Sequence, residues 1–282
     1  MFDAHRRAPL AAALLLLTAQ SPTPATAPLA PQGPWVVDYA ETQCTAIRKY
    51  RHPGGMLTFG VRPAPTGDSY ELLVGWNRAG PDNAQELKGS VDFGQGPIEA
   101  WLLHYGGKSE KGEKLDAYAY RISANEMAKA RSSKAVTVNT RGGPDITLGL
   151  DNMGPLLAGL QTCTDDLKRY WNFDGLNGGT IAVPSKGNAR GLLTTDDYPD
   201  EAVLRGQQGT AQFLLLVDEK GGIAGCHVQK PSGIPLLDAT GCQVMRQRMK
   251  MKPARDAQGR PVRSTVVTPP VTWQLFDSQI RR

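Results

Sequence analysis

The chain has 282 residues, of which 40% are hydrophobic and 21% are charged. It can therefore build a sizeable core, and the composition excludes a wholly disordered or fibrous protein. The formal net charge is a mild +5, and the positive residues are scattered along the chain. Because nucleic-acid binders gather positive charge in a stripe, this distribution indicates an ordinary solvated surface.

The N-terminus has the pattern of a secretory signal peptide. His5-Arg6-Arg7 precede an apolar run over 8–19, and small residues follow. The run is shorter than the roughly 20 apolar residues that a membrane-spanning helix needs. We therefore expect residues 1–27 to be a cleaved signal peptide, 28–34 to form a flexible leader, and the protein to reside in the periplasm. An uncleaved anchor in the inner membrane is the alternative.

Residues 35–172 are predicted to form a β-rich domain. Apolar and aromatic runs bounded by Gly and Pro clusters are typical of strands. These runs lie at 36–39, 56–61, 70–76, 87–93, 98–105, 117–120 and 135–138. Between the last two, Ser123-Ala124-Asn125-Glu126 match a capping box, which predicts a short helix through Met127 and Ala130.

A longer helix, packed on this domain, is predicted over 153–171, where apolar residues recur at spacings of three and four. Cys163 lies on the apolar stripe and therefore faces the core. A disulfide from Cys163 to Cys44, which follows the first strand, would close a loop of about 120 residues and stabilise the fold by roughly 4–5 kcal/mol. Two buried free thiols are the alternative.

Four cysteines in an exported chain favour disulfides over metal or redox sites. None of their spacings is C-x-x-C, so a zinc ribbon and a thioredoxin-type site are not supported. His52, His104 and His227 are isolated in the sequence, and G-x-S-x-G, H-E-x-x-H and phosphate-loop motifs are absent from it. We expect no catalytic, metal-binding or cofactor-binding residues, and an enzyme with its site in the N-terminal domain is the least favoured reading.

The segment 173–192 is rich in Gly and Asn and is predicted to be a linker, followed by a second domain over 193–282. This second domain is expected to begin with a helix over 198–204, capped by Asp197. Two strands at 211–217 and 223–229 follow, then a helix from near Ile234. An extended run over 262–275 closes the domain.

An ordered set of short motifs in this block resembles the TonB C-terminal domain family. The motifs are Tyr198-Pro199, Gly209-Thr210, Val217-Asp218-Glu219-Lys220-Gly221, Ser232-Gly233, Leu237-Asp238, Lys252-Pro253-Ala254 and the final strand over 271–275. The likeness covers about residues 190–276, a third of the chain. It implies two helices packed on a small antiparallel sheet, so the whole chain is expected to be an α+β protein.

In this layout Cys226 lies on the second strand and Cys242 on the helix that packs against the sheet. A disulfide between them would cross-link a domain of only about 90 residues, whose hydrophobic core alone gives little stability. This pairing is additional to the usual pattern of the family.

The resemblance implies a module that binds proteins by adding an extended segment of the partner to a sheet edge. Pro269-Pro270 are tolerable only at an edge, which leaves a docking strand of Val271, Thr272, Trp273, Gln274 and Leu275. The implied partner is a periplasmic segment of an outer-membrane receptor of the TonB-dependent transport machinery, or another envelope protein. A homodimer is left open.

A basic run has two readings: a solvated helix end, where cations favour the helix dipole, or a docking surface for an acidic partner. The run contains Arg246, Arg248, Lys250 and Lys252. In energy-transducing members of the family that this block resembles, a membrane helix and a long Pro-rich spacer precede the domain. Here a short signal and a globular block precede it. A soluble periplasmic adaptor or envelope-structure protein is therefore the alternative function.

Overall fold

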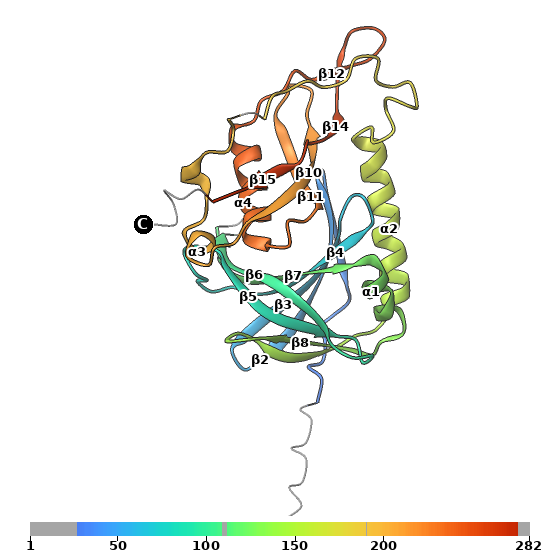
Figure 1. Cartoon of the computed structure of the whole chain (residues 1–282). Helices are drawn as coiled ribbons and strands as arrows, with labels where there is room; N and C mark the ends of the chain where they lie inside the picture. Colours follow the sequence, from blue (N-terminus) through green and yellow to red (C-terminus); the bar gives the residue numbers. More distant parts are fainter. Residues whose placement is uncertain (1–26, 109–111, 190, 276–282) are drawn as a thin grey trace, which may run out of the picture.

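The computed structural model describes residues 27–108, 112–189 and 191–275 (Figure 1). The expected signal peptide, apart from Ala27, lies outside the described residues. Within the described part, the helices are all too short or too polar to cross a membrane. Figure 1 shows a curled β-sheet region, a smaller C-terminal region beside it, and the long helix α2 running along both.

The N-terminal region is a nine-stranded antiparallel sheet with the order β1-β2-β3-β4-β7-β6-β5-β8-β9. Its strands are β1 (Val36–Ala40), β2 (Gln43–His52), β3 (Gly55–Pro63), β4 (Ser69–Trp76), β5 (Gln85–Asp92), β6 (Ile98–Lys108), β7 (Lys114–Ser123), β8 (Ala135–Thr140) and β9 (Asp145–Gly149). Seven of them match the predicted strands. β2 and β9 were not predicted.

The segment 28–34, expected to be a flexible leader, is hydrogen-bonded to β9, at one end of this sheet, and to β2, next to the other end. Leu29 donates to Thr147 O on β9 at 2.8 Å, and Gln32 donates to Lys49 O on β2 at 2.9 Å. Because the sheet is curled, one short segment reaches strands that lie far apart in the sheet order. The leader prediction was wrong for these residues, since they have fixed backbone partners.

The sheet curls around a core built from alternating residues, such as Leu57, Phe59 and Val61 on β3, all fully buried. The missed strand β2 places a charged residue on this inner side. Arg48 is only 7% exposed, and its Nη1 lies 2.5 Å from Asp151 Oδ1, just before α2. An isolated buried charge would be costly, so this ion pair is what makes an arginine acceptable there.

The predicted capping box is present at the start of α1 (Ala124–Ala128). The Glu126 N–H donates to Ser123 Oγ at 3.2 Å, and the Ser123 N–H donates to Glu126 Oε2 at 2.6 Å. The chain continues in a 3₁₀ turn over Lys129–Ser132. The short helix therefore begins where the sequence predicted it.

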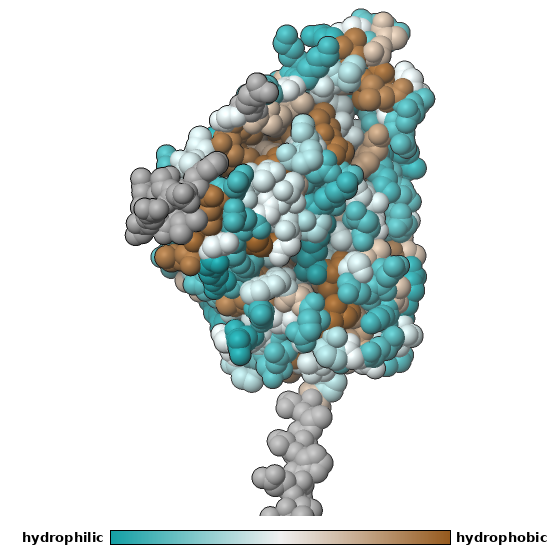
Figure 2. Space-filling view, in the orientation of Figure 1, coloured by the Kyte–Doolittle hydropathy of each residue, from teal (hydrophilic) through white to brown (hydrophobic). Residues whose placement is uncertain are grey.

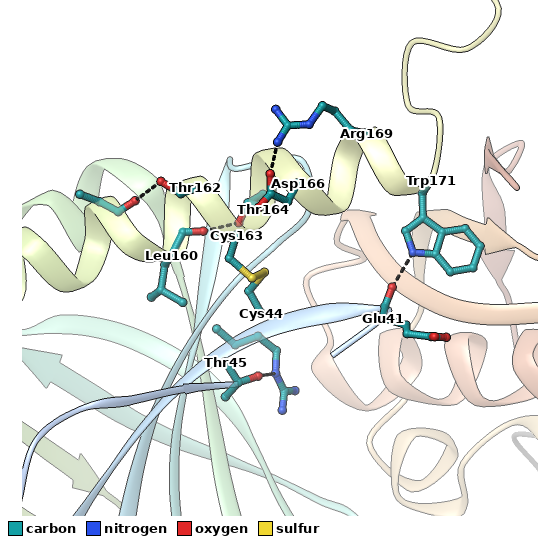
Figure 3. Close-up of a disulfide and its surroundings, with 12 residues drawn as sticks. Glu41, Cys44, Thr45, Leu160, Thr162, Cys163, Thr164, Asp166, Arg169 and Trp171 are labelled. Atoms are coloured by element: carbon teal, nitrogen blue, oxygen red, sulfur yellow. Dashed lines mark hydrogen bonds and ion pairs between the residues drawn. A yellow bond between two sulfur atoms is a disulfide. The ribbon is translucent and has the colours of Figure 1, made fainter. Parts of the chain in front are cut away.

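The long helix α2 (Met153–Tyr170) packs its predicted apolar stripe against the sheet. Figure 3 shows the disulfide between Cys163 on this helix and Cys44 on β2. After the helix ends, the buried Trp171 donates its indole N–H to Glu41 O at 2.6 Å. Helix and sheet are thus joined covalently, as expected, and by a hydrogen bond between distant segments.

The C-terminal region contains a small antiparallel sheet and two α-helices, as the resemblance implied, and the whole chain is α+β. Its elements are α3 (Asp200–Leu204), β10 (Gly209–Val217), β11 (Ile223–Lys230), α4 (Pro235–Arg248), β12 (Ala254–Arg255), β13 (Pro261–Val262), β14 (Ser264–Val267) and β15 (Val271–Trp273). One local expectation was wrong. Asp197 does not cap α3, because its carboxylate accepts the Thr194 N–H at 2.8 Å and closes a preceding 3₁₀ turn. Pro199 occupies the N-cap of α3 instead.

The segment predicted as a linker, 173–192, is held along the C-terminal region. Val183 and Arg255 exchange backbone hydrogen bonds of 3.0 and 2.8 Å, and Lys186 does the same with Lys252 at 3.1 and 2.8 Å. Many of its backbone groups therefore have fixed partners. This pairing holds the second region close to the end of α2.

The two regions are packed against one another. Leu216 of β10 is buried against Leu167 and Trp171 at the end of α2. At the same place, the Asn172 side chain donates to Arg263 O at 2.8 Å, and the Arg263 guanidinium lies 4.0 Å from the centre of the Tyr170 ring. The end of α2 is therefore shared between the regions.

Candidate protein-binding edge

The candidate edge belongs to the C-terminal sheet, whose central strand is β10. Phe213 and Leu215 of β10 are fully buried beneath α4, while Leu216 faces α2. β11 pairs with one side of β10, and β14 and β15 pair with successive halves of the other side. The sheet therefore has two outer edges, one formed by β11 and the other by β14 and β15.

The second edge is interrupted as predicted, because Pro269-Pro270 separate β14 from β15. Proline has no backbone N–H and cannot continue a ladder of hydrogen bonds. Thr268 compensates on the inner side, where its N–H donates to Phe213 O at 2.9 Å and its Oγ1 accepts the Phe213 N–H at 3.1 Å. The two halves of the edge thus remain attached to one strand.

The five residues of the predicted docking strand differ in exposure. Trp273 and Leu275 are buried with Tyr198, and the Trp273 and Tyr198 rings meet edge to face at 5.3 Å. Val271 is partly buried, whereas the side chains of Thr272 and Gln274 are exposed. Only Thr272 and Gln274 therefore present whole side chains to solvent.

The direction of the backbone N–H and C=O groups singles out the same two residues, Thr272 and Gln274. The Leu275 N–H donates to Gln208 Oε1 at 3.0 Å, so it is turned toward the β10 side. Because successive residues of an extended chain direct their N–H and C=O groups to opposite sides, we infer that Val271 and Trp273 pair with β10. The backbone groups of Thr272 and Gln274 then face away from the sheet.

The edge at β11 is covered by the N-terminal region. Arg121 Nη2 on β7 donates to Val228 O at 2.7 Å. His227 is partly buried at this junction, next to the backbone of Thr42, and desolvation lowers the pKa of its imidazole to about 4. A neutral histidine and a carbonyl already occupied by arginine leave little room for another strand at β11.

The predicted disulfide between Cys226 and Cys242 joins β11 to α4, with a Cα–Cα separation of 5.5 Å. Beside it, Gly241 faces the ring of Phe213 so closely that an added Cβ would lie 2.6 Å from Phe213 Cζ. Helix α4 is therefore fixed on the sheet both covalently and by close packing. The sheet that contains the edge strands β14 and β15 is therefore held rigidly against α4.

The residues of the basic run are exposed and lie on two different elements. Arg246 and Arg248 lie in the last turn of α4, and Arg248 Nη2 is paired with Asp197 Oδ1 at 2.7 Å. The hydrogen bonds to Asp197 hold the pKa of that carboxyl below its usual range. Lys250 and Lys252 follow in an extended segment that pairs with Gly222 and Lys186. Their role in docking stays a prediction.

The three histidines that the structure describes, His52, His104 and His227, do not gather into one site. His104 Nε2 lies 2.7 Å from Asp116 Oδ1, and its ring stacks on Tyr118 at 4.1 Å. Arg78 shares the same carboxylate at 2.7 Å, which makes this an ion-pair cluster. Among the residues that the structure describes, His, Cys, Asp and Glu side chains are nowhere grouped in a way that could hold a metal ion.

Comparison with protein families decides the identity of the C-terminal region. Residues 195–275 match the family described as Gram-negative bacterial TonB protein C-terminal. This region is a TonB C-terminal domain. The match does not extend to the nine-stranded sheet, and neither the curated proteins nor the solved structures contain a significant match to the chain. The TonB C-terminal domain is therefore identified, while the N-terminal region is unassigned.

Sequence reasoning missed the residues that cover the β11 edge of the TonB C-terminal domain. Arg121 sits on the outer side of β7, between the inward-facing Tyr120 and Ile122. From the sequence alone, an arginine at such a position reads as solvated. Its contact with Val228 joins residues 107 positions apart, and no local pattern carries that information.

Proposed function

We propose that the TonB C-terminal domain of this protein binds an extended segment of an envelope protein by strand addition to the β14–β15 edge. The observation that carries this proposal is the difference between the two edges. Arg121 and its neighbours cover β11, whereas Thr272 faces outward with an exposed side chain. The domain has one edge left for a partner strand within its described residues.

The backbone groups and exposed side chains of this edge suit strand addition. An unpaired strand offers backbone N–H and C=O groups, which supply affinity to any extended partner without requiring particular side chains. Val267 is 47% exposed on β14 and Thr272 is exposed on β15, so alternate positions could add selectivity. Trp273 and Leu275 contribute by fixing the strand in the core and not by contacting the partner.

The place of action that we propose is the periplasm. Two disulfides are suited to an oxidising compartment, and the basic and apolar N-terminus is typical of an export signal. Family membership of the domain makes a periplasmic segment of an outer-membrane receptor the first partner to test.

A second candidate, an adaptor without energy transduction, is favoured by the attachment of the domain. The disulfide of Cys44 and Cys163 fixes α2 to the nine-stranded sheet, and the end of α2 is buried against β10. The N-terminal region therefore adjoins the binding domain directly. A flexible spacer in its place would allow the binding domain to reach distant partners.

The test compares two substitutions at one residue. Thr272→Pro removes the outward N–H but leaves the inward hydrogen bonds of Val271 and Trp273, so folding should survive. Thr272→Ala removes the side chain and keeps the N–H. In affinity capture from outer-membrane extract, we expect Thr272→Pro to lose a partner that the wild type and Thr272→Ala retain. Equal capture by Thr272→Pro, or equal loss in both variants, would reject backbone-mediated strand addition.

A further inference from the structure

A cavity of about 460 Å³ lies between the nine-stranded sheet and the TonB C-terminal domain. One wall is the outer side of β3, β4, β6 and β7, and the other is formed by β11, the start of α4 and its last turn. Neither region builds the site alone. Its volume lies within the range of about 300–1,000 Å³ that is typical of pockets for small molecules.

Part of the lining is apolar. Trp101 and Leu103 of β6 lie on one wall, and Val228 and the Cys226–Cys242 disulfide lie on the other. Trp101 is 40% exposed, unlike the buried Trp76, Trp171 and Trp273. Lys88 Nζ lies 4.8 Å from the centre of the Trp101 ring, a cation–π contact that helps to position the indole. An apolar group could therefore be desolvated here.

The rest of the lining carries an excess of positive charge. Three arginines contribute to it: Arg62, Arg121 and Arg246. Arg62 is paired with Glu71 at 2.8 Å, but the hydrogen bonds of Arg121 go to the neutral Ser69 Oγ and Val228 O. Arg246 is exposed and forms no ion pair with a described residue. The remaining carboxyl, Asp238, accepts the Ser232 N–H at 2.9 Å and also interacts electrostatically with Arg121. Three arginines against two carboxyls, Glu71 and Asp238, leave an excess of one positive charge in the lining.

We propose that this cavity binds a small amphipathic anion, with one carboxylate head and an apolar body. The head would lie between Arg121 and Arg246, because a guanidinium fork matches a carboxylate in geometry and charge. The apolar body would lie along Trp101 and Leu103. A ligand with both features uses the two kinds of lining at once.

The experiment is calorimetric titration of the full chain with three probes: octanoate, acetate and octanamide. Octanoate has both head and body, acetate has only the head, and octanamide has the body without the charge. We expect saturable binding of octanoate, accompanied by a change in tryptophan fluorescence. The other two probes should bind at least about tenfold more weakly, a difference of about 1.4 kcal/mol.

Three variants locate the site. Arg246→Gln and Trp101→Gln should each weaken octanoate binding by about tenfold or more. The control is Lys250→Gln, which removes an equal charge from the same basic run but does not line the cavity. Thermal melting of each variant verifies that it is folded. Absence of octanoate binding, equal binding of octanamide, or equal losses in Arg246→Gln and Lys250→Gln would overturn the proposal.

Discussion

Arg121 and Val228 join the two regions of the protein, because the Arg121 guanidinium donates to the Val228 carbonyl at 2.7 Å. The carbonyl belongs to β11, which is an outer strand of the TonB C-terminal domain. A side chain of the nine-stranded sheet thus takes a backbone partner that another strand would otherwise use. Because this contact obstructs β11, the strand addition that we propose is directed to the opposite edge.

Removing the contact should uncover β11. In Arg121→Met we expect the amides of 223–230 to exchange hydrogen faster by about tenfold or more, since a lost hydrogen bond to a charged donor is worth about 1.5–3 kcal/mol. Hydrogen-exchange mass spectrometry measures this change. Arg141→Met, at an exposed turn, is the matched control and should leave 223–230 unchanged. Unchanged exchange in Arg121→Met would show that the arginine does not protect this edge.

The two disulfides should contribute unequally to stability. Their cysteines are separated by 119 positions for Cys44–Cys163 and by 16 for Cys226–Cys242. Chain entropy predicts a loss of about 4–5 kcal/mol for the longer loop and about 3 kcal/mol for the shorter one when both cysteines of a pair become alanine. Denaturant unfolding of the two double variants measures the order. A greater loss for Cys226→Ala/Cys242→Ala would contradict the expectation from loop length.

Substitution by alanine should lower the stability of the protein at Gly241 and raise it at Gly159, although both glycines lie in helices. Gly241→Ala places a Cβ against the buried Phe213 ring, and we expect a loss of about 1–3 kcal/mol from overpacking. Gly159→Ala, in α2, has no neighbour within 4 Å of the added Cβ. It should gain up to about 1 kcal/mol from helix propensity. Thermal unfolding compares the two, and stabilisation by Gly241→Ala would refute the close packing of α4.

His227 should make stability fall in mild acid. Its pKa is lowered in the folded protein from 6.5 to about 4, because burial disfavours the charged imidazole. The unfolded chain therefore binds the proton first, and the contribution of His227 is complete above pH 6.5 and is lost as the pH falls toward 4. The loss at pH 4 is on the order of 3 kcal/mol.

The measurement is the free energy of unfolding between pH 7 and 4 for the wild type and for His227→Gln. The uncharged glutamine removes this titration while the other acidic groups remain. We expect the stability of the wild type relative to the variant to decline over that interval. Parallel pH profiles would show that His227 is accessible to protons in the folded state.

Local patterns predicted most elements of the fold, and tertiary contacts account for the rest. The capping box at Ser123 and the apolar stripe of α2 are local, and both were predicted correctly. Strand β2 was missed because Arg48 occupies a core-facing position, so apolar alternation fails there. That charge is neutralised by Asp151, which is distant in sequence. The leader around Leu29 was misjudged for the same reason, because its partners are on β9 and β2.

The candidate site was predicted in part. Pro269-Pro270 correctly indicated an edge, but the sequence could not separate exposed Thr272 from buried Trp273, since that depends on packing against Tyr198. The cavity between the regions was not predictable at all. Arg62 and Arg121 belong to β3 and β7 of the nine-stranded sheet and Arg246 to α4, so the three line one cavity only because the two regions pack together.

Figure 2 shows apolar side chains in separate patches on one face of the molecule, including a patch over α3. That helix ends at Leu204, which is 87% exposed. Apolar exposure alone therefore does not single out the β14–β15 edge on this face. Geometry of the backbone at Thr272 is the more specific guide to a partner.

The most direct test of strand addition at this edge is photocrosslinking in cells that export the full chain. A photoreactive phenylalanine is placed at Thr272, at Gln274 or, as a control, at the exposed Lys230 on β11. We predict a defined envelope-protein adduct from Thr272 and Gln274 and none from Lys230. An adduct from Lys230, with none from Thr272 or Gln274, would contradict the central claim.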